Sequence, residues 1–169
     1  SLVSDGGAAV VLTSAEHARH LQRPPAYLLG AGEGYGHEHI SAAHSLTTSS
    51  AVLSSERAYA MAGVSADDIS FIELYDCFTP VVLIELEDLG FCEKGEGGAL
   101  ARSGRLRAAA AMNNQRDALP MNTHGGLLSH AHPGNPGSMF ALTEAVVQMQ
   151  RRAGDRQLPD TSLALLHAQ

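Results

Sequence analysis

The sequence predicts an α/β layered fold with a mixed sheet. Short runs rich in β-branched and aromatic residues alternate along the chain with stretches that have helical caps and helical apolar spacing. The chain has 169 residues, of which 44% are hydrophobic, and this is enough to bury the core of one ordinary domain. Because strands that alternate with helices are joined by crossovers, we expect at least part of the sheet to be parallel.

The first third of the chain is expected to hold two strands, two helices and a long loop. The run "AAVVLTS" (8–14) favours a strand, and "AEHARHLQ" favours a helix capped by Ser14. "PPAYLLG" restarts as a strand, after which residues 30–50 are small, polar and rich in histidine, which is typical of a long loop over a surface or a site. "SSERAYAMAG" then predicts a helix that begins at a serine cap and ends at Gly63.

The remaining elements continue the alternation. Residues 69–76 predict a strand, and "TPVVLIELEDLGF" predicts a helix with Pro80 in its first turn. "GSMFALTEAVVQMQRRAG" predicts a helix that ends at Gly154, with Arg151 and Arg152 in its last turn, where cations suit the helix dipole. "SLALLHA" predicts a closing strand.

Charge and cysteine content exclude several classes of protein. The formal net charge is -7 and no basic tract opposes it, so we expect no nucleic-acid surface, although a small anionic ligand needs only a local site. No run of about eighteen apolar residues predicts a membrane span, and no basic segment at the start predicts a signal peptide. We therefore expect a cytoplasmic protein. Cys77 and Cys92 lie in apolar surroundings, which favours buried reduced thiols over a disulfide.

The segment "LPMNTHGGLLSHAHPGNPGS" (119–138) concentrates histidine, glycine and proline directly before a predicted helix. It fits a metal site, a flexible loop or an active-site loop. His124, His130 and His132 could bring two imidazoles to one metal, but the loop holds no carboxylate or thiol and the spacing matches no standard zinc pattern. The stretch "GAGEGYG" is only a weak dinucleotide fingerprint, since it lacks the spacing G-x-G-x-x-G. We therefore predict no metal and no resident cofactor.

Two segments share a setting that favours a ligand site. "IELYDCF" and "NTHGGLLSHAHPGNPGS" each lie at the end of a predicted strand and before a predicted helix, where ligands bind in α/β sheets. Both resemble the carboxyl-terminal half of the thiolase superfamily, in the branch of sterol carrier protein x and lipid-transfer thiolase-like proteins, close to steroid side-chain aldolases. The first family motif reads N-E-A-F in thiolases, H-D-C-F in the sterol-carrier branch and Y-D-C-F in the aldolases, as at residues 75–78 here. The second, N-x-x-G-G…G-H-P-x-G, is matched at Asn122, Gly125, Gly126, Ala131, His132, Pro133 and Gly137.

The resemblance implies a thiolase-like layered fold in which this chain contains parts of two domains. Residues 1–22 would be the last strand of an amino-terminal half with its connector, and residues 23–169 the carboxyl-terminal domain, with a variable surface excursion at about 95–118. In the family the nucleophilic cysteine, where there is one, belongs to the first half. That half is not present in this sequence and the closing strand looks incomplete, so we expect part of a larger or split enzyme that is inactive by itself.

The resemblance also implies catalytic roles for the tyrosine and the histidines of the two motifs. His132 resembles the histidine that donates a hydrogen bond to an enolate oxygen, although a loop histidine can instead simply bond a backbone carbonyl. Tyr75 would act as acid or base on a substrate hydroxyl in a retro-aldol cleavage, or would only be packed. His130 stands where the aldolases often have tyrosine; it would carry a proton or point to solvent. In an extended segment, His130 and His132 would face the same way.

Three further residues have a structural and a functional interpretation. Gly125 and Gly126 would let the backbone approach a thioester or pantetheine arm, or would form a plain turn. Cys77 is expected to be a small core residue and not a nucleophile.

The function expected from the resemblance is carbon-carbon cleavage of a lipid or sterol-type acyl chain held as a CoA thioester, with the retro-aldol reaction favoured. One alternative is a Claisen-type acetyl-CoA acyltransferase half, and another is a non-catalytic partner subunit. The expected partners are acyl-CoA as substrate, an amino-terminal thiolase half or a homodimer mate, and an OB-fold/zinc-ribbon protein. Neither nucleic acid nor membrane is expected to bind.

Overall fold

The computed structural model describes residue 1 and residues 3–168, which divide into two compact units. The first unit comprises Ser1–Tyr27, Ile69–Phe78 and Arg105–Gln169, and the second comprises Leu28–Asp68 and Thr79–Gly104. Within the described residues, no helix is long and apolar enough to cross a membrane.

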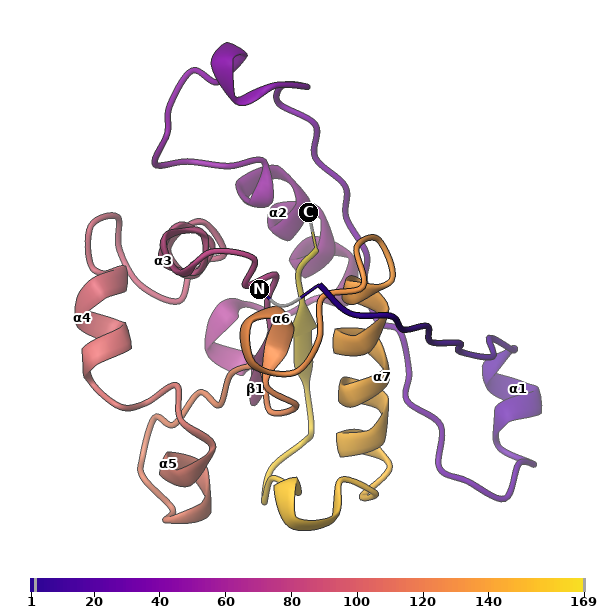
Figure 1. Cartoon of the computed structure of the whole chain (residues 1–169). Coiled ribbons are helices and arrows are strands. Elements are labelled where there is room, and N and C mark those ends of the chain that lie inside the picture. Colours follow the sequence, from indigo (N-terminus) through magenta and orange to yellow (C-terminus); the bar gives the residue numbers. More distant parts are fainter. Residues whose placement is uncertain (2, 169) are drawn as a thin grey trace. The chain divides into compact units, whose positions relative to one another are not determined.

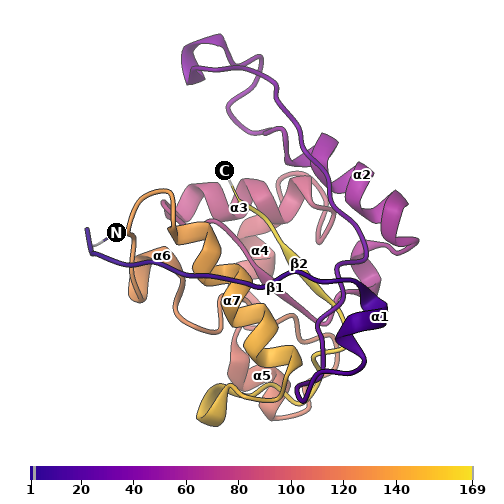
Figure 2. The same ribbon diagram turned by 90° about the vertical axis from the view of Figure 1, so that its right-hand side faces the viewer.

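The first unit is built on a parallel pair of strands, β1 (Phe71–Glu73) and β2 (Ala164–Leu166), in which Phe71 lies opposite Ala164 and Glu73 opposite Leu166. The predicted parallel arrangement and α/β class are thereby confirmed. Helix α7 (Gly137–Met149) contacts both strands and runs alongside them in Figures 1 and 2. Its Ala145 forms a buried cluster with Phe71 and Leu158.

Shorter elements complete the first unit. They are α1 (Ala15–Ala18), α5 (Ala108–Met112), α6 (Gly126–Ser129) and the 3-10 turn η3 (Gly154–Arg156). The predicted cap of α1 is confirmed, because the Ser14 hydroxyl accepts a hydrogen bond from His17 N at 3.2 Å. Met121 forms a parallel bridge with Ile72, so the chain that leads into the histidine-rich segment runs beside β1.

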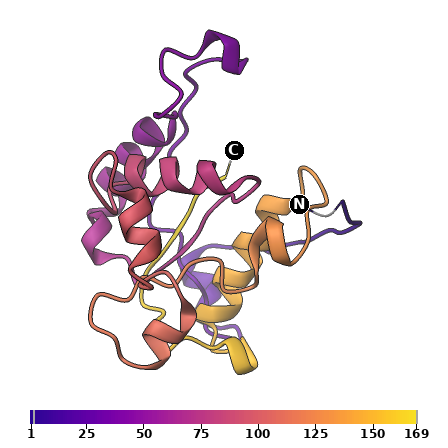
Figure 3. The same cartoon turned by 60° about the vertical axis from the view of Figure 1, so that its left-hand side comes forward.

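The second unit is helical. It holds α2 (Ala51–Ala62), α3 (Thr79–Asp88) and α4 (Gly97–Arg102), with the 3-10 turns η1 (Ile40–Ala42) and η2 (Ala66–Asp68). Helix α3 contacts both α2 and α4, and Figure 3 shows α3 and α4 as neighbours. As predicted, α2 ends where Gly63 adopts a left-handed conformation with φ 70°, and Pro80 lies in the first turn of α3.

The glycine-rich stretch 30–36 runs antiparallel to α2 at very short range. A Cβ atom on Gly30 would lie 2.3 Å from the Ala58 carbonyl oxygen, and one on Gly32 would lie 2.0 Å from that of Ser54. Gly34 repeats the contact against Ser50, at 2.6 Å. The helix partners are four residues apart and therefore share one face of α2. The alternate glycines thus allow the chain to lie directly on a helix backbone.

Several predicted elements are wrong or shorter than expected. Residues 8–14 and the stretch "PPAYLLG" form no strand, and Val11 and Leu12 are 93% and 84% exposed. A strand needs a neighbour for its backbone hydrogen bonds, and neither stretch pairs with another described segment. The strand expected at 69–76 is confined to β1, and α2 begins earlier than the predicted serine cap, at Ala51.

The predicted surface excursion at 95–118 contains two helices, α4 and α5, of six and five residues. Such short helices show little periodicity in sequence, and the surface excursion itself stays a prediction. Helix α7 ends at Met149 and not at Gly154, because Arg151 adopts a left-handed conformation with φ 56°. The Arg151 side chain donates to the carbonyl oxygens of Leu158 and Pro159, so it serves the turn after the helix.

Replacing Gly32 with alanine tests the glycine contact with α2. The new Cβ would meet a backbone oxygen at 2.0 Å, which only a shift of the main chain can relieve. We expect a loss of about 1–3 kcal/mol in the free energy of unfolding, measured by urea denaturation. Gly36→Ala is the matched control, since its Cβ would meet only the rotatable Ser50 hydroxyl, at 2.9 Å. Equal stability of the two variants would contradict the packing role.

Candidate functional site

Asn122 joins the two sequence motifs at the carboxyl end of β1. Its side-chain oxygen accepts from Leu74 N at 2.7 Å, its side-chain nitrogen donates to Leu74 O at 3.1 Å, and its backbone N donates to Ile72 O at 3.0 Å. The side chain therefore continues the sheet pairing where the backbone turns away, with Asn122 at φ 48°. This bonding positions Tyr75 and Asp76 next to the residues that follow Asn122.

Asp76 holds the start of α6. The carboxylate is buried and accepts a hydrogen bond from Leu127 N at 2.6 Å. Gly126 lies against it, since a Cβ there would be 2.2 Å from Asp76 Oδ2, and both Gly125 (φ 108°) and Gly126 (φ 64°) are left-handed. The lack of a side chain at Gly126 therefore lets the Asp76 carboxylate lie against the backbone. Their contact with a thioester stays a prediction.

Tyr75 and His132 lie together, with ring centroids 6.1 Å apart in an edge-on arrangement. His132 is fixed by its backbone N, which donates to the Ser4 hydroxyl at 2.9 Å. Its Nδ1 accepts a hydrogen bond from Gly134 N at 3.2 Å, so a neutral ring carries its proton on Nε2. His132 is thus prepared to donate a hydrogen bond through Nε2.

His130 has different neighbours. It is the residue that caps the carboxyl end of α6, with φ -102° and ψ -72°, so the segment is not extended at this point. The side chain is exposed, and its ring lies 5.6 Å from that of His124 and 5.7 Å from that of Phe140. His130 and His132 therefore contact separate groups of side chains.

Two further predictions concern metal-ligating side chains and the cysteines. The described part of the chain contains no group of three or more histidine, cysteine or acidic side chains that could hold a metal ion. Neither Cys77 nor Cys92 forms a disulfide, as expected, but both are half-buried instead of buried. The Cys77 carbonyl oxygen accepts a hydrogen bond from the Ser1 hydroxyl at 3.3 Å.

Beneath the loop lies a polar network that the sequence motifs did not indicate. Glu73 is fully buried at the end of β1, and its Oε1 accepts from the backbone N and the hydroxyl of Thr123 at 3.1 and 2.9 Å. Its Oε2 lies 2.9 Å from His124 Nδ1. A carboxylate in the apolar run "ISFIELYD" is the signal that could have revealed it, because a buried charge requires partners.

The network continues to a second buried carboxylate, that of Glu144 on α7. The Thr123 hydroxyl reaches Glu144 Oε1 at 2.8 Å, Gln148 Nε2 donates to the same oxygen at 3.0 Å, and Arg156 pairs with Oε2 at 3.0 Å. Burial raises the pKa of Glu144, but the hydrogen bonds from Arg156, Gln148 and Thr123 outweigh burial, so its pKa lies below the ordinary value. Glu144 is therefore ionised and neutralised by Arg156.

A small pocket lies where these parts meet. Its volume is about 10 Å³, close to the least that can hold one water molecule. The side chains around it include several that can exchange protons or hydrogen bonds: Tyr75, Asp76, His124, Ser138 and His167. The backbone N of His167 donates to Glu73 O at 3.0 Å, which ties the end of β2 to the same place.

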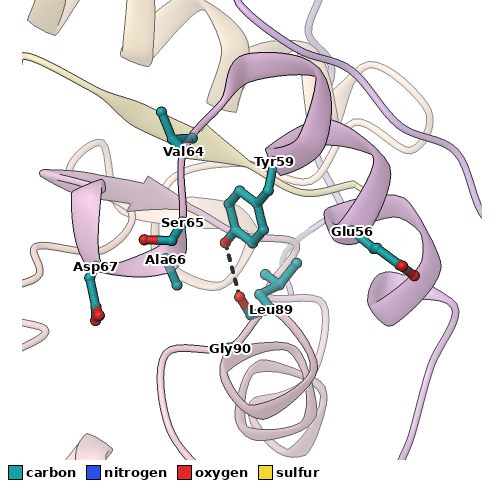
Figure 4. A pocket seen from close by; sticks show the side chains of 8 residues that line it. All are labelled: Glu56, Tyr59, Val64, Ser65, Ala66, Asp67, Leu89 and Gly90. Atoms are coloured by element: carbon teal, nitrogen blue, oxygen red, sulfur yellow. Dashed lines mark hydrogen bonds between the residues drawn. The ribbon is translucent and has the colours of Figure 1, made fainter.

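The second unit has a larger surface depression of about 460 Å³, between the end of α2 and the end of α3 (Figure 4). In Figure 4 the Tyr59 ring points into it, and the hydroxyl donates to Leu89 O at 2.9 Å. Burial raises the pKa of Tyr59 to about 12, so this phenol stays protonated near neutral pH. The tyrosine of this depression is therefore held in a hydrogen bond to the backbone. The Tyr75 pocket differs, because it is lined by side chains suited to proton transfer.

The chain belongs to the family described as "Thiolase C-terminal domain-like", whose sequence model matches residues 32–169. It is 32% identical to the acetyl-CoA acetyltransferase of Methanothermobacter thermautotrophicus over 168 residues, which cover 99% of this chain and 42% of that protein. It is 39% identical to the steroid side-chain-cleaving aldolase of Thermomonospora curvata over 134 residues, which cover 76% of this chain and 32% of that protein.

A solved structure, the "Ltp2-ChsH2(DUF35) aldolase", matches with a TM-score of 0.78 and 34% identity, over 90% of this chain and 38% of that one. This chain thus spans less than half the length of each of these relatives. The thiolase-like fold and the resemblance to the branch of sterol carrier proteins and steroid side-chain aldolases are confirmed.

Removing the Asp76 carboxylate should destabilise the loop that carries His132. In Asp76→Ala the buried Leu127 N–H loses its acceptor, and we expect a loss of about 1–3 kcal/mol in the free energy of unfolding. Asp76→Asn keeps an acceptor oxygen of the same shape and should lose less. Thermal and urea unfolding measure both variants, and an equal loss in the two would contradict the capping role.

The Glu144–Arg156 pair predicts a loss of stability in acid. Because the folded state lowers the pKa of Glu144, the ionised carboxylate stabilises the fold above the pKa of the unfolded chain. That contribution is lost as the pH falls below about 4.5 and through the folded pKa. In Arg156→Met the fall in melting temperature between pH 6 and pH 3 should be smaller than in the unmodified protein. An unchanged fall would contradict this origin.

Proposed function

We propose that this chain is the carboxyl-terminal, thiolase-like part of an enzyme that cleaves a carbon-carbon bond in the acyl chain of a lipid or steroid CoA thioester by a retro-aldol reaction. The observation that carries the proposal is the approach of Tyr75, in a Y-D-C-F motif, to His132, whose Nε2 can donate. The steroid side-chain-cleaving aldolase of Thermomonospora curvata, 39% identical over the matched region, supports the same reaction class.

The chemistry requires two functions at the reacting centre. A base must remove the proton of the β-hydroxyl while the bond between the α and β carbons breaks, and a donor must stabilise the enolate oxygen that forms. Tyr75 is the candidate for the first function and His132 Nε2–H is the candidate for the second. Preorganised donors of this kind are often the largest single contribution to catalysis.

The substrate must extend well beyond the Tyr75 pocket. A volume of about 10 Å³ holds about one water molecule and is far too small for an acyl-CoA molecule. We propose that an amino-terminal thiolase half or a second copy of the protein supplies the rest of the surface. An OB-fold/zinc-ribbon protein is the further partner, which the Ltp2-ChsH2(DUF35) aldolase supports because its name joins two proteins.

A Claisen-type acyl transfer is the second candidate function. It is supported by the acetyl-CoA acetyltransferase of Methanothermobacter thermautotrophicus, which matches 99% of this chain. In such an enzyme a cysteine outside this chain would be the nucleophile and base, and Tyr75 would have only a packing role.

Tyr75→Phe in the complete enzyme separates the two reactions. The change removes one hydroxyl, and loss of a general base costs about 10² to 10⁴-fold in rate. We expect retro-aldol turnover to fall by about that factor with little change in KM, measured as ketone release from β-hydroxyacyl-CoA thioesters that include the substrate of the Thermomonospora curvata aldolase.

Tyr35→Phe is the matched control, because the Tyr35 side chain is 87% exposed. Near-full ketone release by Tyr75→Phe would leave the tyrosine with a packing role. Thiolysis of acetoacetyl-CoA by the same variant would then support the acyltransferase.

A further inference from the structure

We propose that His124 is the proton carrier of the Tyr75 pocket and that Glu73 is the carboxylate that orients it. The inference rests on the proposed function, because it names the residue that receives and returns the proton in the same reaction. His124 and Tyr75 both line the pocket, and His124 occupies an unspecified position (x) of the N-x-x-G-G motif, to which the resemblance assigned no role.

Glu73 is built into the unit so that only one of its oxygens faces the histidine. The carboxylate is fully buried at the end of β1, where the strand fixes its backbone. Thr123 holds Oε1 through both its backbone N and its hydroxyl, and Oε2 is left 2.9 Å from His124 Nδ1. A carboxylate in this position can orient a catalytic imidazole.

The charges of the buried network lead to the same pairing. Glu73 and Glu144 share the Thr123 hydroxyl, which has one hydrogen and can therefore donate to only one of them at a time. Arg156 neutralises Glu144 at 3.0 Å. The side chain that lies next to Glu73 Oε2 is that of His124, and a buried carboxylate oxygen without a donor beside it would be costly.

The proposed dyad gives the two histidines opposite tautomers. His132 Nδ1 accepts a hydrogen bond from Gly134 N, so its proton lies on Nε2. His124 Nδ1 and Glu73 Oε2 are both buried, lie 2.9 Å apart and have no other hydrogen-bond partner among the described residues, so the dyad assigns the proton to Nδ1 and leaves the electron pair of Nε2 on the neutral ring available. One ring is therefore prepared to donate to an oxyanion and the other to accept a proton.

His130, the other candidate for a proton carrier, lacks these features. Its side chain is exposed and its ring packs edge-on against His124 and Phe140, whereas the His124 side chain is only 9% exposed. The other acidic group of the pocket, Asp76, is engaged by Leu127 N. The pairing of His124 with Glu73 thus distinguishes it from its neighbours.

The proton balance of the step is closed. The β-hydroxyl proton moves to the Tyr75 oxygen, and the phenolic proton of Tyr75 moves to His124 Nε2, while the electron pair of the breaking carbon-carbon bond enters the enolate. A phenol ionises only near pH 10, so a tyrosine base needs such an acceptor. The imidazolium is stabilised by Glu73 and returns its proton, through Tyr75, to the α carbon of the enolate. No net proton is gained or lost.

Kinetics of the complete enzyme test the carrier role. His124→Gln cannot carry a proton, and we expect kcat for retro-aldol cleavage to fall by about 10² to 10⁴-fold with little change in KM. Added imidazole should restore part of the turnover of His124→Ala, which a purely structural role would not allow. His20→Gln, at an exposed position, is the control. Full activity of His124→Gln, or a larger loss in His130→Gln, would overturn the proposal.

A second measurement is independent of turnover. A proton held between His124 Nδ1 and Glu73 should give a downfield imidazole N–H resonance in the NMR spectrum of the protein. The signal should persist in His20→Gln and disappear in both His124→Gln and Glu73→Gln. Its absence from the unmodified, folded protein would overturn the dyad.

The two measurements separate the two proposals. If Tyr75→Phe abolishes cleavage while His124→Gln keeps it, the proposed function stands and the carrier role of His124 is wrong. If the enzyme cleaves no β-hydroxyacyl-CoA, the retro-aldol function and the carrier role that depends on it both fail, whatever the resonance shows.

Discussion

The first unit depends on the burial of a carboxylate, Glu73, at the end of a short parallel strand. A fully buried charge must be paired and hydrogen-bonded, and this requirement brings Thr123 and His124 to the strand end. Through Thr123 the requirement extends to Glu144 on α7 and to Arg156 beyond it. The loop with the histidines is therefore anchored to both the sheet and the helix that contacts it.

The same loop is anchored a second time by neutral hydrogen bonds. Asn122 replaces a backbone partner for Leu74, and Asp76 accepts the Leu127 N–H at the start of α6. Together these contacts fix the backbone on either side of His124 without using the imidazole Nε2. A site that exchanges protons benefits from this arrangement, because the reactive atom stays available while its support is rigid.

Glycines act in two different ways in the two units. In the second unit Gly30, Gly32 and Gly34 allow one chain segment to lie on the backbone of α2, because a Cβ atom at any of them would collide with a helix carbonyl oxygen. In the first unit Gly125 and Gly126 adopt left-handed conformations and leave room for the Asp76 carboxylate. Neither set of contacts requires a nucleotide or a metal, so the glycine-rich composition follows from packing in both places.

The sequence by itself determined the α/β class, the carboxyl end of α2 and the start of α3, since Gly63 and Pro80 act on their own neighbours. The two motifs also sufficed for the thiolase-like family. The sequence could not determine which β-rich runs become strands, because strand pairing depends on a distant partner. Residues 8–14 have no such partner among the described residues, whereas β1 and β2 pair although they lie more than ninety residues apart. Nor could it show the pairing of Glu73 with His124. Only tertiary structure brings together side chains that are fifty-one residues apart in the sequence.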